Sequence, residues 1–351
     1  MEIHTIGIDL GKTVFHLVGL NLRGEVVVRK KCSRNQILRF TSNLRVSLIG
    51  MEACGGAHFL GRALREQGHD VRLMPAQYVK PYVKTNKNDY IDAEAIAEAV
   101  GRPNMRFVPI KTDDQLDLQS LHRVRERWVG RRTAVINQIR GLLLERGVTI
   151  RKGRLHIETA LPGILEDPEN KLSGALRVLL AQLQLEMRYL QGQIEESDKL
   201  ILRIAGDLEA CRRLVAIPGI GPLTATATVA AIGNGAAFKK GRGFAAWLGV
   251  VPGEHSTGGK QKLTGTSRRG NRYLRKLFVQ GAHSVLLQKT KQTAGLSTWL
   301  ANLTSRKRAQ VATVALANKM ARMAWAVLTK EEAYRPPLLP QAAGADALAC
   351  N

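Results

Sequence analysis

The order of strands and helices in the first hundred residues restricts the fold more than any other feature of this sequence. Turn residues at 21–24 separate two of the β-rich runs and predict a hairpin there. The predicted elements are strands 3–9, 13–20 and 25–31, helix 35–43, strand 46–52, helix 57–68, strand 71–75 and helix 89–100. Three strands followed by alternating helices and strands are typical of an α/β sheet of the ribonuclease H type.

Four carboxylates fall at the ends of these elements. Asp9 ends the first strand and Glu52 ends the fourth. Asp89 and Asp92 lie three residues apart, on one face of a helix start. In a sheet of this type the first and fourth strands are neighbours and a later helix closes over their ends. We therefore expect the four side chains to converge on one small volume.

Such mutually repelling charges predict a metal site. Carboxylates crowded together need cations between them, and hard oxygen ligands favour Mg²⁺ or Mn²⁺. Two such ions could stabilise the attacking and leaving oxygens of a phosphoryl displacement. Each carboxylate alone also has a structural interpretation, as a turn former, a solvated residue, a helix cap or a partner of the helix dipole.

The start of the first strand, Gly-Ile-Asp-Leu-Gly-Lys-Thr, has a second interpretation. Sugar kinases and actin-like folds open with a similar strand and turn, in which the Asp holds magnesium and glycine amides meet phosphate. Those folds need further phosphate and adenosine loops, and we find no convincing set. The net charge of +24 does not suit a sugar substrate either.

Positive charge is concentrated in two segments. Residues 211–330 contain twenty Lys and Arg but a single acid, Glu254, and residues 120–155 contain ten against two acids. A surplus of this kind gives strong, salt-sensitive affinity for nucleic acid. The alternatives are a ribosomal-type surface or a general contribution to solubility.

The rest of the chain reads as mainly helical. Long helices are predicted at 113–147 and at 172–205, with a linker between them. The second carries an apolar stripe that packs within the chain or forms a dimeric coiled coil. The stripe consists of Leu172, Leu176, Leu179, Leu183, Met187, Leu190 and Ile194. We predict four parts: a catalytic domain 1–110, basic and linking helices 111–210, a C-terminal domain 211–330 and a loose tail 331–351.

Two motifs stand out in the C-terminal domain. Residues 214–233 have the form of a helix-hairpin-helix, in which Gly219 and Gly221 let backbone amides approach a phosphate. An ordinary corner between two helices is the alternative. Residues 253–276 form a Gly-, Ser- and Lys-rich segment with Ser256 and Thr257 beside two glycines. A serine there could attack a phosphodiester, but the residues alone favour a loop that merely holds phosphates.

Several motifs together resemble the IS110 family of insertion-sequence transposases. They are GIDLGK, GMEACGG, NKNDYIDAEAIAEA, IPGIGPLTA and FAAWLGVVPGEHSTGGKQKLTGTSRRGNRYLR, in this order from about residue 3 to 330. The HSTGGK segment is most similar to the IS1111 branch. The resemblance implies a RuvC-like N-terminal domain with a DEDD metal site, a linking coiled coil and a C-terminal transposase domain with a catalytic serine.

The resemblance also implies residue roles and partners. The DEDD set falls on Asp9, Glu52, Asp89 and Asp92, and the nucleophile on Ser256, with Thr257 where many relatives have a second serine. Relatives are guided to donor and target DNA by a structured RNA from the element, often called bridge RNA. Relatives place the serine against the carboxylates of another subunit, so we expect this chain to form dimers on each DNA and a tetramer when the two meet. The candidate contacts to RNA and DNA are Arg123, Arg127, Arg131, Arg132, Gly219, Gly221, Lys260, Lys262, Arg268, Arg269, Arg272 and Arg275.

Two other functions stay open. One is a junction resolvase that uses only the carboxylates, with water as nucleophile, and the other is a non-catalytic nucleic-acid-binding protein with a decayed metal site. The sequence has no run of 18 uncharged apolar residues and no signal peptide at its start, so we expect no membrane span and a cytoplasmic protein. The resemblance to insertion-sequence transposases implies that it is prokaryotic and nucleoid-associated. Its four cysteines lie far apart and are expected to be free thiols.

Overall fold

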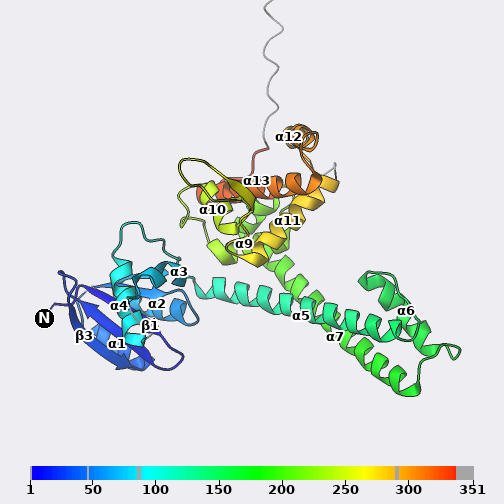
Figure 1. Cartoon of the computed structure of the whole chain (residues 1–351), viewed down its shortest axis with the longest axis horizontal. Helices are drawn as coiled ribbons and strands as arrows, with labels where there is room; N and C mark the ends of the chain where they lie inside the picture. The colour runs from blue at the N-terminus through cyan, green and yellow to red at the C-terminus, as the bar shows by residue number, and fades with distance from the viewer. Residues whose placement is uncertain (1, 46, 85–87, 289–291, 337–351) are drawn as a thin grey trace, which may run out of the picture. The chain divides into compact units, whose positions relative to one another are not determined.

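The chain forms two compact units, Met1–Asp113 and Asp114–Asn351. The structure is a computed structural model that describes residues 2–45, 47–84, 88–288 and 292–336. Figure 1 shows the strands of the first unit in blue and the helices of the second in turquoise (α5) through green to red. The unit that begins at Asp114 contains both the linking helices and the C-terminal helices.

The first unit is built on a five-stranded mixed sheet with the strand order β3-β2-β1-β4-β5. β1 pairs antiparallel with β2, β2 pairs antiparallel with β3, and β4 and β5 continue the sheet parallel to β1. The sheet of the ribonuclease H type that the sequence predicts is therefore present. Its strands are β1 (Thr5–Leu10), β2 (Phe15–Leu20), β3 (Val26–Cys32), β4 (Leu48–Glu52) and β5 (Asp70–Met74).

Helices cover both faces of this sheet. The helices of the unit are α1 (Arg34–Ser42), α2 (Ala57–Glu66), α3 (Ala76–Val79), the 3₁₀ turn η1 (Lys80–Tyr82) and α4 (Asp89–Val100). One core lies between the sheet and α1 and α2, where Ile8 and Ile49 pack with Leu60. A second core lies on the opposite face, where α4 meets β2 through Val18 and Ala93.

Two glycines let α4 lie directly on the strands. A Cβ atom built on Gly7 of β1 would lie 2.0 Å from the carbonyl oxygen of Ala93. A Cβ atom on Gly50 of β4 would lie 2.7 Å from the Cβ of Val100. Gly7 and Gly50 are register partners in the parallel pair. The backbone of the sheet therefore meets α4 at van der Waals distance, which fixes the helix above the ends of β1 and β4.

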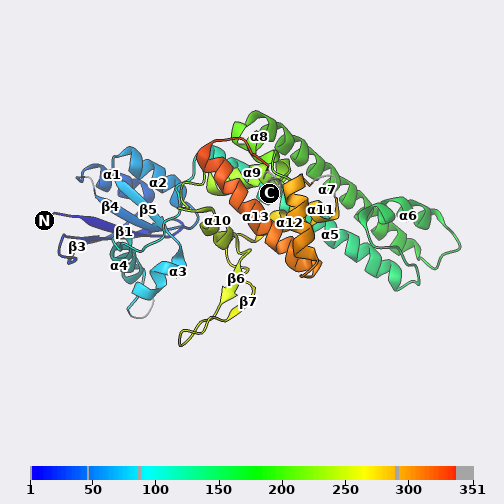
Figure 2. The ribbon, with the colours of Figure 1, turned by 90° about the horizontal axis from the view of Figure 1, so that it is seen from above.

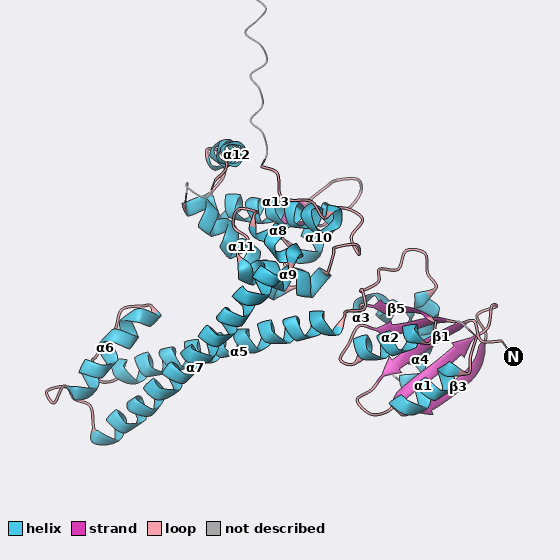
Figure 3. Ribbon diagram, turned by 180° about the vertical axis from the view of Figure 1, so that it is seen from behind, coloured by secondary structure: helices cyan, strands magenta, loops and turns pink. Residues whose placement is uncertain are grey.

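A helical hairpin opens the second unit. α5 (Asp113–Leu144) and α7 (Gly174–Asp207) run side by side, and α6 (Arg154–Glu166) packs near their connection (Figure 3). The sequence predicts only a linker at 147–170, so α6 corrects that interpretation. Gly153 just before it and Pro162 within it are poor helix signals.

The apolar stripe of α7 packs within the chain. Leu176, Met187 and Leu190 are buried against Ile139 of α5 and Leu161 of α6. Leu179 departs from the pattern, because its side chain is 52% exposed. Of the two possibilities that the sequence leaves open, intrachain packing explains this stripe.

The C-terminal helices pack around α13 (Ala309–Lys330). They are α8 (Glu209–Val215), α9 (Pro222–Ile232), α10 (Gly241–Leu248), α11 (Arg272–Leu287) and α12 (Ala294–Thr304). The core is formed by side chains such as Phe244, Phe278 and Leu316. The sequence does not predict α10 or α12. It also treats residues 252–271 as a loop, where the structure has an antiparallel pair of β6 (Pro252–Glu254) and β7 (Leu263–Thr266).

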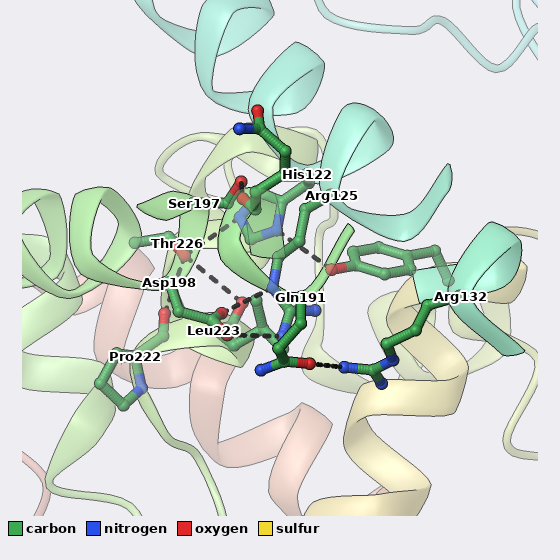
Figure 4. Close-up of polar contacts among 11 residues, drawn as sticks. His122, Arg125, Arg132, Gln191, Ser197, Asp198, Pro222, Leu223 and Thr226 are labelled. Atoms are coloured by element: carbon green, nitrogen blue, oxygen red, sulfur yellow. Dashed lines mark hydrogen bonds and ion pairs between the residues drawn. The ribbon is translucent and has the colours of Figure 1, made fainter. Parts of the chain in front are cut away.

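A polar network, buried at His122 and exposed at Asp198, joins the long helices to the C-terminal helices (Figure 4). The ring of His122 on α5 lies 3.0 Å from Thr226 Oγ1 of α9 and 3.1 Å from the hydroxyl of Tyr273 on α11. Next to it, Arg125 donates two hydrogen bonds to Asp198 of α7, of 2.6 and 3.1 Å. Buried polar groups with partners on several helices fix how those helices pack.

Two smaller expectations also concern the fold. Among the described helices, none combines the length and the apolar character that crossing a bilayer requires. Cys32, Cys54 and Cys211 are free thiols, as predicted, and Cys350 lies outside the described residues. Most of the predicted tail, from 337 onward, also lies outside them.

Candidate active site

The two strand carboxylates lie on the face of the sheet that α4 covers. Asp9 lies two residues after Gly7 on β1, and Glu52 lies two residues after Gly50 on β4. Side chains alternate between the faces of a strand, so both carboxylates face the same side as the glycines beneath α4. Since Gly7 and Gly50 are paired, Asp9 and Glu52 lie at neighbouring strand ends.

The other two carboxylates lie in the first turn of α4. Asn88 caps this helix, because its Oδ1 accepts a hydrogen bond of 2.9 Å from the backbone N–H of Tyr90. Asp89 and Asp92 follow the cap, so neither is needed to start the helix. Their negative charge near a helix N-terminus is favourable by itself. Their position above the strand carboxylates brings four negative charges close together.

Burial and mutual repulsion raise the pKa of both strand carboxyls. For Asp9, desolvation raises the pKa most, followed by repulsion from Asp92 and then Asp89. For Glu52, desolvation again comes first, followed by repulsion from Asp9 and Asp92. Each of the four carboxylates therefore lies close enough to another to disturb its charge. The structure brings together the four residues that the sequence singles out.

His16 is a fifth member that sequence reasoning missed. It lies directly opposite Asp9 in the antiparallel pair of β1 and β2. Its Nδ1 lies 3.4 Å from Oδ2 of Asp89, and its ring packs edge-on against Tyr90 with centroids 4.8 Å apart. Counting back across the turn at 11–14 pairs residue 16 with residue 9, so the register of the hairpin was the signal that could have revealed it.

These ligand atoms fit a divalent cation. One oxygen of Asp9, one of Asp89 and one ring nitrogen of His16 lie within 4.8 Å of one another. Glu52 and Asp92 add two more carboxylates that repel this group. Desolvation and then mutual repulsion raise the pKa of Asp9 and Glu52, and a cation held between the carboxylates would offset the repulsion. The donor set, carboxylate oxygens with one imidazole nitrogen, implies a divalent metal.

Ser256 lies near the tip of a β-hairpin in the second unit. Thr257 and Lys260 exchange backbone hydrogen bonds of 3.3 and 3.0 Å across the tip. The two residues between them, Gly258 and Gly259, have φ angles of +55° and +73°. Two consecutive positive φ angles are the mark of a type I′ turn, which strongly favours glycine at both positions. Figure 2 shows this hairpin, labelled β6 and β7, extending from the helices of its own unit.

The hairpin separates its two hydroxyl side chains. The Oγ of Ser256 donates a hydrogen bond of 2.5 Å to Oε1 of Glu254, two residues earlier on the same face. Thr257 is the next residue, so its side chain belongs to the opposite face, with those of His255 and Lys262. Ser256 and Thr257 are both exposed, but their side chains lie on different faces of the hairpin.

Some of the side chains predicted to contact nucleic acid are exposed, and others bind neighbouring residues of the chain. Arg123 and Arg127 on α5 are exposed, whereas Arg131 pairs with Glu186 at 2.9 Å and Arg132 donates to Gln191 of α7. In the C-terminal segment Arg275 donates to the carbonyls of Leu248 and Arg269, which ties the chain after β7 to α10. The exposed cations of this segment are Lys260, Lys262, Arg268, Arg269 and Arg272.

The predicted helix, glycine turn and helix of 214–233 is present as α8 and α9, and its two glycines differ. Gly219 has a φ angle of +86°, and a Cβ there would lie 2.9 Å from the carbonyl oxygen of Gly281 on α11. Its lack of a side chain is explained by packing. Gly221 is the N-cap of α9, and a Cβ added there would meet no other atom within 4 Å, so packing does not explain this glycine.

Comparison with known proteins assigns the family. Residues 6–146 match the IS110-type DEDD transposase model, and residues 211–296 match the model described as "Transposase IS116/IS110/IS902 family". The chain is 45% identical over 338 residues to a probable family 20 transposase of Pseudomonas aeruginosa, which covers 96% of this chain and 100% of that protein.

Two further relatives are transposases of named insertion sequences. The transposase of element IS1328 from Yersinia enterocolitica is 41% identical over 329 residues, 94% of this chain and 98% of its own length. That of element IS1111A from Coxiella burnetii is 40% identical over 334 residues, 95% of this chain and 92% of its own length. Likeness of this extent defines the chain as a transposase, an enzyme that transfers DNA strands. It belongs to the IS110/IS1111 family of insertion-sequence transposases, as its motifs predicted.

Proposed function

We propose that this transposase cuts and rejoins DNA strands through a covalent bond between Ser256 and DNA, guided by a structured RNA from its own element. The observation that carries the proposal is the charge coupling among Asp9, Glu52, Asp89 and Asp92 at one edge of the sheet. That coupling supports a site built to hold cations and a phosphate. A Mg²⁺ or Mn²⁺ ion bound there supplies Lewis-acid stabilisation of the phosphate oxygens.

A covalent bond between the serine and DNA conserves the energy of the phosphodiester bond that is cut. The Oγ of Ser256 attacks the scissile phosphorus, the Oγ–P bond forms, and the bond from phosphorus to the 3′ oxygen breaks. The 3′ oxygen leaves as a hydroxyl, and the phosphate stays attached to the serine. The 3′-hydroxyl of a second strand then attacks this phosphoserine and restores a phosphodiester. Since one ester replaces another at each step, the exchange needs no high-energy cofactor.

The partners follow from the same proposal. The exposed Arg123 and Arg127 of α5 and the exposed cations around the hairpin suit contacts to nucleic-acid backbones. Specificity comes from pairing between the guide RNA and both DNAs. We further propose dimers on each DNA and a tetramer when they meet, in which Ser256 of one subunit serves the carboxylates of another.

The test is capture of the covalent adduct. Cells express the full chain with the flanking DNA of its element, the lysate is denatured, and protein-linked DNA is quantified. We expect adducts in the wild type and in Thr257→Ala, and none in Ser256→Ala or Asp9→Ala. Thr257→Ala is the matched control, because it alters the same hairpin on its other face.

Other outcomes of this experiment would support the junction resolvase or the non-catalytic binding protein. Cleaved DNA without an adduct, unaffected by Ser256→Ala, identifies a junction resolvase that uses water. Neither cleavage nor adduct, with every Asp9→Ala phenotype unchanged, identifies a non-catalytic binding protein. Adducts that persist when the non-coding flanks of the element are deleted contradict RNA guidance and leave the serine chemistry standing.

A further inference from the structure

The nucleophile proposed above has a carboxylate as its hydrogen-bond partner. Oε1 of Glu254 accepts a bond of 2.5 Å from Ser256 Oγ and a second of 3.2 Å from Nε2 of Gln261. Glu254 and Ser256 are two residues apart on one strand, and Gln261 faces Ser256 across the hairpin just below the turn. The three side chains therefore share one face. Lys260 and Lys262 lie on either side of Gln261 along the same strand, so their side chains are on the opposite face of the hairpin.

The negative charge of Glu254 lies in a strongly basic part of the chain. It is the only acid among residues 211–330, which hold twenty Lys and Arg. None of the ion pairs between described residues includes Glu254. A carboxylate in a domain that binds polyanions opposes that binding, and this one is not used to pair with a neighbouring cation. Its partners are the hydroxyl and the amide.

The two hydrogen bonds favour the ionised form of this carboxyl group. The bond from Ser256 lowers the pKa of Glu254 most, and the bond from Gln261 lowers it further. A carboxylate that is ionised at neutral pH can receive a proton. An alcohol needs such a base, because its oxygen becomes a strong nucleophile only as its proton leaves.

We propose, on the basis of the function proposed above, that Glu254 is the proton acceptor for Ser256. As Ser256 Oγ forms its bond to phosphorus, its proton passes to Oε1 of Glu254. The bond from phosphorus to the 3′ oxygen breaks, and that oxygen takes a proton from water. In the return step the attacking 3′-hydroxyl gives up its proton to solvent, and the proton on Glu254 returns to Ser256. Gln261 is a positioning residue that holds the carboxylate in place.

The variant Glu254→Gln removes proton transfer while it leaves the geometry around Ser256 nearly unchanged. The amide keeps an oxygen that can accept the hydrogen bond from Ser256, but it cannot take the proton. Purified full chain is incubated with Mg²⁺, RNA transcribed from the element and a labelled duplex carrying the element's end, and the rate of adduct formation is measured. We expect a loss of about a hundredfold or more at neutral pH, the usual range for general-base catalysis. Glu254→Asp keeps the base and should retain part of the rate.

The pH profile and chemical rescue are readouts that a merely structural role would not move. Between pH 7 and 9 the wild-type rate should change little, since the carboxylate is already ionised. The Glu254→Gln rate should rise about tenfold per pH unit, because hydroxide must then remove the proton. Formate should restore adduct formation in Glu254→Ala and have no effect in Ser256→Ala.

The outcomes separate this inference from the function on which it rests. If Glu254→Gln forms adducts at the wild-type rate or faster while Ser256→Ala forms none, Glu254 is not the proton acceptor and the serine mechanism stands. If Ser256→Ala itself forms adducts, the proposed function fails as well. Equal DNA binding by wild type and Glu254→Gln, measured in the same buffer, shows that a lost rate does not come from lost affinity.

Discussion

Asp9 and His16 face each other across the antiparallel pair of β1 and β2, and His16 Nδ1 lies 3.4 Å from Asp89. A ring nitrogen therefore joins a site otherwise made of carboxylate oxygens. Nitrogen ligands suit Mn²⁺ better than Mg²⁺, which binds oxygen almost alone. We therefore expect the choice between the two ions to depend on His16, a residue outside the DEDD set.

The first prediction concerns this choice of metal. His16→Gln should weaken Mn²⁺ binding by about tenfold, with a smaller effect on Mg²⁺. Calorimetric titration of the full chain with each ion measures both affinities, and nitrogen couplings in the Mn²⁺ electron resonance spectrum report the imidazole directly. His4→Gln, on the exposed side chain preceding β1, is the control. Equal losses for both ions, or no nitrogen coupling in the wild type, would show that His16 is not a ligand.

The second prediction is that removing the carboxylate of Asp9 stabilises the metal-free protein. The raised pKa of Asp9 means that its ionised form is unfavourable in the fold, so stability falls as pH rises through that pKa. Asp9→Asn removes this cost, and we expect the first unit to melt roughly 2–4 °C higher in EDTA at pH 7.

The same variant should lose the stabilisation that Mg²⁺ confers on the wild type, because a ligand is gone. Thermal scans with EDTA and with Mg²⁺ measure both effects. A lower melting temperature for Asp9→Asn in EDTA would mean that the carboxylate is favourably solvated and that repulsion does not govern the site.

The third prediction concerns the contact between α4 and β1. Gly7→Ala places a methyl group 2.0 Å from the carbonyl oxygen of Ala93, so the helix must move away from the sheet. We expect a loss of at least about 3 kcal/mol in the free energy of unfolding of the first unit, together with loss of metal binding. Urea denaturation measures the former. Gly101→Ala, at the end of α4 with open space and a φ angle of −81°, should be close to neutral.

The fourth prediction uses the buried His122. Burial, assisted by repulsion from Arg125, lowers its pKa from 6.5 to about 4. Between these values the unfolded chain binds more protons than the folded one, so the second unit loses stability as pH falls below 6.5 and the effect is absent above it. From pH 7 to 5 the loss should be about 2 kcal/mol.

The control for this effect is His122→Gln, which cannot titrate. Its absolute stability will be lower, but its slope of unfolding free energy against pH should be flatter than that of the wild type across this window. Parallel slopes would mean that His122 stays protonated or stays exposed to solvent.

The sequence predicts some elements closely because their signals are local. α4 begins at Asp89 as expected, since Asn88 caps it and alanines follow. α6 was missed because Pro162 within it and Gly153 before it are read as signs of a linker. The hairpin around Ser256 was missed because glycine, serine and lysine lack the alternation of a strand. Its order comes from two positive φ angles and backbone pairing across the turn.

The candidate site was predictable only in part. The four carboxylates could be found because each one ends or begins a regular element. His16 and Glu254 could not, since a lone histidine in a strand and a lone glutamate in a basic loop are ordinary. The role proposed for each depends on register, since His16 lies across from Asp9 and Glu254 lies on the same face as Ser256.

The direct contact of α4 with Gly7 and Gly50 determines which substitutions can alter the distance between the helix and the sheet. Where side chains separate a helix from a sheet, every substitution in that layer alters the distance between them. Here backbone meets helix at Gly7, so the spacing between the strand carboxylates and those of α4 is set by atoms that nearly every protein residue possesses. Substitutions that repack the opposite face of the sheet, for example at Ile8 of β1 or Leu60 of α2, should therefore change the stability of the unit but not the spacing of the four carboxylates.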